Sequence, residues 1–145
     1  MNKMLWLTLM AVSMSAACTI AIGGSDDTAP REFNFDAPYD AVWDAAIAAF
    51  ADLELPISTL EKESGVIATD WILLDDAAEL MDCDGNVRAE EGRFNAIVRG
   101  TAAGTRMTLT ASYRAQDPDD GVALRCSSTG VMEERVRGRV DDLLD

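Results

Sequence analysis

Residues 93–114, RFNAIVR-GTAAG-TRMTLTASYR, set the architecture of this chain more firmly than any other stretch. Apolar and polar residues alternate with a period of two over residues 93–99 and again over residues 105–114, which predicts two strands that each bury one face. The predicted buried face consists of Phe94, Ala96, Val98, Met107, Leu109, Ala111 and Tyr113. The glycine-bounded residues 100–104 predict the turn, so the segment is interpreted as a long antiparallel hairpin.

A helix is predicted on each side of this hairpin in the sequence. The first opens within residues 36–40, because Pro38 suits the first helical position and an acid in the first turn suits the helix dipole. It ends before Pro56, and its apolar face comprises Val42, Ala45, Ala46, Ala49, Phe50 and Leu53. The second helix follows a cap at Thr129 or Gly130. Its apolar stripe comprises Met132, Val136, Val140, Leu143 and Leu144.

Shorter strands complete the predicted sheet, at residues 31–35, 57–61, 66–73 and 122–126. The second and third of these flank Glu63-Ser64-Gly65, a hairpin turn with a glycine that can adopt a positive φ. Residues 75–87 break the alternation and are interpreted as an insertion with one helical turn and a loop. The sequence therefore predicts one α+β domain over residues 31–145, in the order β-α-β-β-insertion-β-β-β-α. Its antiparallel sheet packs against two helices.

The first 30 residues are predicted to be a processing signal followed by a tether. Lys3 gives a positive start, residues 4–14 an apolar core, and residues 15–17 the small side chains that a signal peptidase requires. Ser15-Ala16-Ala17-Cys18 resembles a bacterial lipobox, which implies a signal peptide over residues 1–17 and acyl chains on Cys18. Two or three chains give stable anchoring. Residues 18–30 then form a lipid-anchored, flexible tether.

Two other interpretations of the N-terminus remain open. Residues 4–22 are uncharged and just long enough for an uncleaved transmembrane anchor. The small residues before Cys18 also fit an ordinary secretory cleavage site, which would release a soluble protein. The cysteines favour lipidation, because a modified Cys18 leaves Cys83 and Cys126 as an even pair for one disulfide in an oxidising compartment.

Composition excludes several classes of chemistry. The chain has no histidine, which excludes Ser-His-Asp and Cys-His catalysis and histidine-ligated zinc. No phosphate-cradling glycine motif is present, so no nucleotide cofactor is predicted. The net charge is −14, and it becomes −15 after a cleavage that removes Lys3 and no acid. Such a charge opposes binding to nucleic acid. We expect neither a catalytic site nor a cofactor.

Several acidic residues in and after the insertion also suggest a calcium-binding loop. Asp82, Asp84, Gly85 and Glu91 stand at offsets 3, 5, 6 and 12 of an EF-hand-like loop, but offset 1 is Leu80 where that motif needs an acid. The interpretation preferred is an exposed acidic turn without metal.

Two pairs of conspicuous side chains are given structural roles. Trp43 and Trp71 are expected in the core, because each falls at the periodicity of its helix or strand. Glu133 and Arg137 are spaced as i,i+4 partners on an exposed helix face. Neither pair is predicted to form a binding site.

Residues 35–43 and 60–71 carry a resemblance to a known family. FDAPYDAVW at 35–43 and LEKESGVIATDW at 60–71 resemble the helix-grip domain of BamC-like lipoproteins, with a Val-Trp in the first helix and Gly-x-Ile and Asp-Trp in the hairpin. The resemblance implies a helix-grip fold and an accessory role near outer-membrane β-barrel assembly, without catalysis. Thr19 is not the aspartate that resembles an inner-membrane retention signal, so we expect an outer-membrane lipoprotein that faces the periplasm.

A second resemblance is to START-type helix-grip proteins, which share a Pro-x-x-Val-Trp-like helix opening. It implies the alternative function, a lipoprotein that carries a small apolar ligand such as a lipid. The prediction preferred is a non-catalytic interaction module, held on the membrane through Cys18 and binding an envelope protein.

Overall fold

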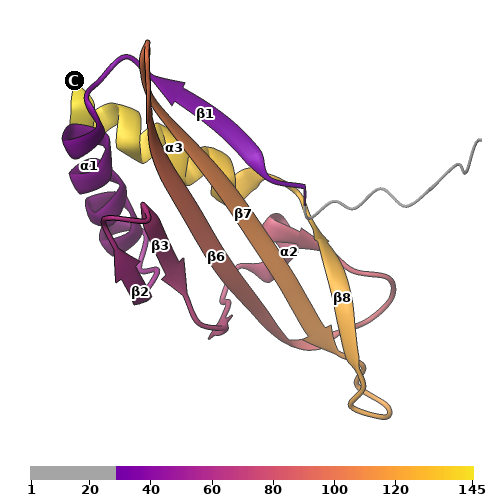
Figure 1. Ribbon diagram of the computed structural model, residues 1–145. Coiled ribbons are helices and arrows are strands. Elements are labelled where there is room, and N and C mark those ends of the chain that lie inside the picture. The colour runs from indigo at the N-terminus through magenta and orange to yellow at the C-terminus, as the bar shows by residue number, and fades with distance from the viewer. Residues whose placement is uncertain (1–28) are drawn as a thin grey trace, which may run out of the picture.

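The structure is a computed structural model that describes residues 29–145. In chain order its elements are β1 (Arg31–Phe35), α1 (Tyr39–Asp52), β2 (Ile57–Glu61), β3 (Val66–Thr69), β4 (Ile72–Leu73), α2 (Ala77–Leu80), β5 (Met81–Asp82), β6 (Arg88–Thr101), β7 (Gly104–Gln116), β8 (Ala123–Ser128) and α3 (Val131–Leu144). Figure 1 shows the long β6–β7 hairpin crossing the molecule, with α1 and α3 packed together on one side of it. The α+β class predicted from the sequence is confirmed.

The sheet is open and antiparallel, and its central hairpin is longer than any of the strands beside it. The strand order is β2-β3-β6-β7-β8-β5, while β1 also pairs with β7 and β4 also pairs with β6. β7 is long enough to pair with β1 at one end, where Leu109 is opposite Arg31, and with β8 at the other, where Tyr113 is opposite Cys126. The two long strands therefore hold the shorter ones in one sheet.

One face of the hairpin forms the hydrophobic core with the two long helices. All seven residues of the predicted buried face are buried. The apolar face predicted for the first helix is buried as well, except for Leu53, which directly follows α1 and is only partly buried. Met132, Val136 and Val140 of α3 are buried as well. Full burial of such side chains stabilises by about 1.5–3 kcal/mol each. Leu143 was predicted to share this stripe but is 39% exposed in the last turn of α3.

Several predicted boundaries were wrong. The strand expected over residues 66–73 is split into β3 and β4, separated by Asp70 and Trp71. The insertion contains α2 and also β5, which pairs with β8 where Met81 is opposite Ser128. The six predicted strands and two predicted helices therefore become eight strands and three helices within residues 29–145. Strands of two residues have too few side chains to show a period.

The turn before β3 depends on a glycine, as predicted. Gly65 has a φ of +66°, and its carbonyl oxygen accepts a hydrogen bond from the Val98 N–H at 2.8 Å. A Cβ atom at this position would lie 2.1 Å from the Val98 carbonyl oxygen. The turn thus lies directly against β6, where only glycine fits.

The predicted signal peptide and Cys18 lie outside the described residues, as do residues 18–28 of the predicted tether. Ala29 and Pro30, the last two residues of that tether, have no regular secondary structure. Within residues 29–145, no helix combines the length and the hydropathy that crossing a membrane requires.

Candidate functional site

The face of the hairpin opposite the helices is lined mostly by polar and charged side chains. Successive side chains of a strand point to opposite faces of the sheet, so five cross-strand pairs of the hairpin point to this open face and not into the core. They are Glu91–Arg114, Arg93–Ser112, Asn95–Thr110, Ile97–Thr108 and Arg99–Arg106, all half-buried or exposed. This open face holds the candidate site.

The break between β3 and β4 places Trp71 on the open face. Both short strands pair with β6, and the Phe94 N–H at the gap between them needs another acceptor. The buried hydroxyl of Thr69 accepts that hydrogen bond at 3.0 Å and donates its own to the Asp70 carbonyl oxygen at 2.8 Å. A buried backbone N–H left without a partner would be costly, so Thr69 stabilises the break.

Trp71 packs against two arginine side chains instead of entering the core. The Arg114 Cζ atom lies 4.2 Å from the centroid of the Trp71 ring, and the Arg93 Cζ atom lies 5.0 Å from it. Both distances fall within the range of cation–π interactions. The prediction of a core position was therefore wrong for Trp71 and correct for Trp43, which is 3% exposed. The reason is the strand break, which takes Trp71 out of the alternation.

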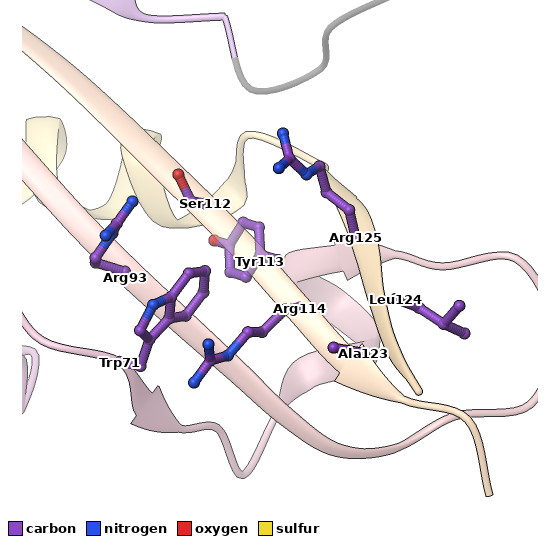
Figure 2. A pocket seen from close by; sticks show the side chains of 8 residues that line it. All are labelled: Trp71, Arg93, Ser112, Tyr113, Arg114, Ala123, Leu124 and Arg125. Atoms are coloured by element: carbon purple, nitrogen blue, oxygen red, sulfur yellow. The ribbon is translucent and has the colours of Figure 1, made fainter. Parts of the chain in front are cut away.

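A third arginine reaches the same place from β8. Arg125 is directly opposite Arg114 in the β7–β8 pairing, an arrangement of like charges that destabilises a sheet. In Figure 2 the side chains of Arg93 and Arg114 lie beside Trp71, whereas Arg125 extends from β8 and points away from the Trp71 ring. All four residues line one hollow and come from four separate segments of the chain. We call these four residues the arginine–tryptophan cluster.

One arginine of the cluster already binds a carboxylate. The Arg114 Nε donates a hydrogen bond to the Glu91 Oε2 at 2.7 Å. A register shift between Arg88 and Glu91 precedes this pair, and such a bulge re-aims the side chains beside it. Arg93 and Arg125 make no ion pair with any carboxylate of residues 29–145.

The cluster lines a hollow of about 310 Å³. Its walls are formed by Trp71, Arg93, Ser112, Tyr113, Arg114, Ala123, Leu124 and Arg125 (Figure 2). A second hollow of about 500 Å³ lies over β2, β3, β6 and β7, and Arg93 and Ser112 line both. Because they share these two residues, the two hollows are neighbours on the open face, and we refer to them together as the groove. Arginine and hydroxyl side chains line it together with the apolar side chains of Trp71, Leu124 and Ile97, so the groove suits a ligand that carries both polar and apolar groups.

Behind the cluster, on the core side of β7, lies a buried polar group. Glu133 is only 2% exposed, and the Ser128 Oγ donates to its carboxylate, with Oγ–O distances of 2.8 and 3.1 Å. The same Oγ accepts a hydrogen bond from the Gly130 N–H at 3.0 Å. The first turn of α3 also favours a negative charge at this position. The predicted ion pair with Arg137 was wrong, because Arg137 instead pairs with Asp141 at 2.8 Å.

Tyr113 extends from the hairpin toward this buried carboxylate. Its ring packs edge-on against Phe94, with centroids 5.8 Å apart, and its hydroxyl has no hydrogen-bond partner within residues 29–145. Burial, and secondarily the charge of Glu133, raises the pKa of Tyr113 well above the usual value for a phenol. Tyr113 is therefore neutral at physiological pH and serves as packing.

The two cysteines predicted to pair are joined in the structure. The Sγ atoms of Cys83 and Cys126 are 2.05 Å apart, which ties the insertion to β8. The acids considered for calcium are not gathered: no group of three metal-ligating side chains occurs in the described part of the chain. Glu91, the last residue of that motif, is instead the ion-pair partner of Arg114.

The three arginines of the cluster were not predicted from the sequence to form a site. The available signal was the turn, since a hairpin centred on residues 102–103 places Arg93 opposite Ser112 and close to Arg114. A scan against protein-family models and a search of curated proteins both found no match to this chain.

Proposed function

We propose that this protein is a non-catalytic lipoprotein of the cell envelope that acts as an interaction module. It is anchored through Cys18 in the outer membrane, faces the periplasm and binds an envelope protein through the open face of its sheet. The helix-grip resemblance makes the β-barrel assembly machinery the expected partner. The α+β domain with two long helices on one side of an antiparallel sheet is compatible with a helix-grip fold.

The observation that carries the proposal is the arginine–tryptophan cluster on the uncovered face. Arginine and tryptophan are the residues most enriched among the strong contributors to protein–protein binding. Two of the cluster's guanidinium groups remain unpaired within the described residues, although the chain has 26 acidic residues. Placing like charges opposite each other costs stability, and features that break such local rules often serve function.

The disulfide supports an exported location. Structural disulfides persist in oxidising compartments such as the periplasm and are rare in the cytosol. The Cys83–Cys126 bond therefore agrees with the secretory signal that the first 17 residues resemble.

The alternative function, a carrier of small apolar ligands, has weaker support. Such a carrier needs an apolar cavity between its sheet and its long helix. Here Met132, Val136 and Val140 occupy that space and are buried against α1 and the sheet. The two hollows lie instead on the open face of the sheet, where charged and hydroxyl side chains alternate with apolar ones.

A site-specific crosslinking experiment tests the proposal. A photo-crosslinking amino acid replaces Leu73, which is 74% exposed and directly opposite Glu91, in the full-length, C-terminally tagged protein in its own cells. The control position is Leu143, exposed on α3 on the other side of the molecule. We expect β-barrel assembly subunits to crosslink at Leu73 and not at Leu143. Recovery of the protein alone, together with a co-purified lipid, would instead favour the carrier.

A further inference from the structure

We infer that the groove recognises a carboxylate-bearing, extended segment of a partner protein, with Arg93 and Arg125 as the residues that bind the carboxylate. The inference rests on the proposed function, because it names the chemistry of the partner. It concerns the same open face and the same cluster.

The charges argue for a carboxylate. Seven basic residues within residues 29–145 are paired with an acid: Arg31, Lys62, Arg106, Arg114, Arg135, Arg137 and Arg139. Arg99 donates instead to the Ser64 carbonyl oxygen. Arg88, Arg93 and Arg125 pair with no acid of this part of the chain, and two of these three line the same hollow. Unpaired guanidinium groups that line one hollow favour an anion, and each can donate two parallel hydrogen bonds to a carboxylate.

Glu91 shows how a carboxylate is accommodated here. It accepts a hydrogen bond from Arg114 at 2.7 Å while the Arg114 guanidinium packs over Trp71. A second carboxylate that lies between Arg93 and Arg125 would repeat this arrangement at the other arginines. It would also relieve the repulsion between Arg114 and Arg125, which are neighbours across β7 and β8.

The shape of the groove argues for an extended segment. The two hollows, of about 310 and 500 Å³, share Arg93 and Ser112 and so lie next to each other over β6 and β7. An extended chain of a few residues can follow such a groove. Leu73, 74% exposed beside the cluster, and the Trp71 ring offer contacts for its apolar side chains. A small free anion would use only one end of this surface.

The overall charge favours a peptide segment, and not a membrane surface, as the ligand. A bilayer of anionic lipid presents many headgroups to the whole domain, and the net charge of −14 opposes that approach. A single segment meets only the groove, where the local charge is positive. The two ligands share an anionic group and can be separated by experiment.

The test uses the full-length protein in non-ionic detergent and a dye-labelled peptide in which glutamate alternates with valine. Fluorescence anisotropy gives its dissociation constant. We expect the double substitution Arg93→Gln with Arg125→Gln to weaken binding about tenfold or more, since hydrogen bonds between two charged groups are among the strongest. The matched control is Arg137→Gln, which removes one exposed arginine from α3 and should change the constant by less than about twofold.

A peptide with glutamine in place of glutamate tests the carboxylate directly and should bind about tenfold more weakly or worse. Thermal unfolding of each variant checks folding. If the double variant is unstable, Arg93→Lys with Arg125→Lys keeps the charge and should still weaken binding, because lysine lacks the planar fork. Equal binding of both peptides would overturn the inference. So would binding of phosphatidylglycerol vesicles that depends on Arg93 and Arg125 without binding of the glutamate peptide.

The crosslinking experiment separates this inference from the proposed function. If an envelope protein crosslinks at Leu73 equally well in the wild type and in the double variant, the proposed function stands and carboxylate recognition fails. If no protein is recovered but the glutamate peptide binds through Arg93 and Arg125, the inference about the ligand stands and the proposed function fails.

Discussion

Replacement of both cysteines of the disulfide, Cys83→Ala with Cys126→Ala, should remove a large part of the stability of the domain. The bond joins residues 43 positions apart and thereby restricts the unfolded chain. For a loop of that length the loss of chain entropy corresponds to about 4 kcal/mol, at the upper end of what native disulfides contribute. Domains of this size are stable by roughly 5–15 kcal/mol in total, so the variant should remain folded but with a much smaller margin.

Urea unfolding followed by tryptophan fluorescence measures this loss. Trp43 is buried at 3% exposure, and its emission should change when the core opens. The unlipidated protein, with Cys18→Ala, serves as the parent for both proteins compared. We expect the variant to show a lower midpoint and a steeper dependence on urea, because an uncrosslinked unfolded chain exposes more surface. Reduction of the parent with a thiol should reproduce the same loss.

A loss below about 1 kcal/mol would refute the reasoning from loop length. It would mean that the unfolded chain keeps the ends of the ring close together without the bond. The loss of stability could also differ widely between the variant and the reduced parent. That result would mean that the alanine substitution disturbs packing around the buried Cys126, and that the effect does not come from the unfolded state alone.

Three further predictions follow. Gly138→Ala in α3, where an added Cβ meets nothing within 4 Å, should stabilise by about 1 kcal/mol, whereas Gly65→Ala should destabilise by about 2 kcal/mol or more; urea unfolding distinguishes the two signs. Tyr113→Phe should stabilise by about 1 kcal/mol at pH 7, because it removes a buried hydroxyl without a partner in the described residues. Since the folded pKa of Tyr113 is raised, the parent should lose stability as the pH rises above about 10, and that part of the loss should vanish in the variant. Cys18→Ala should move the protein from the membrane to the soluble fraction, and the intact mass of the membrane-extracted parent should include acyl chains; an unmodified Cys18 in membranes would contradict the lipid anchor.

The fold class followed from the sequence because its signals were periodic. The alternation of residues 93–114 identified the hairpin and its buried face, and the apolar spacing identified α1 and most of the buried residues of α3. The helical turn predicted in the insertion is present as α2. What was missed concerns two short strands: β5 was not predicted, and β4 was taken as the continuation of β3. Their positions depend on pairing with β8 and β6. Such pairing is a tertiary interaction that local sequence does not encode.

The candidate site was missed for a related reason. Trp71 was placed in the core because the strand was assumed to continue through it, whereas a hydrogen bond between the distant residues Thr69 and Phe94 stabilises a break there. Glu133 was placed in solvent because its spacing to Arg137 fits an exposed pair. In the structure α3 is oriented about its axis so that the Glu133 carboxylate faces the protein interior and accepts a hydrogen bond from Ser128. Arg125 was not considered at all, since its position opposite Arg114 depends on the register of β8. Strand registers and helix rotation are set by packing of the whole domain.

The disulfide also has a mechanical consequence. Arg93, Arg114 and Arg125 all lie between Cys83 and Cys126, inside one covalently closed ring. If the N-terminus is held and a partner pulls on one of these arginines, tension enters the ring at Cys83 and divides between two arms, one of which runs through the disulfide. The shorter arm limits how far the ring can open. For Arg125 the shorter arm is the disulfide and the neighbouring Cys126, so the other arm, roughly 150 Å long when fully extended at about 3.5 Å per residue, is not pulled out. The three arginines therefore stay within one covalent loop, whichever of them carries the load.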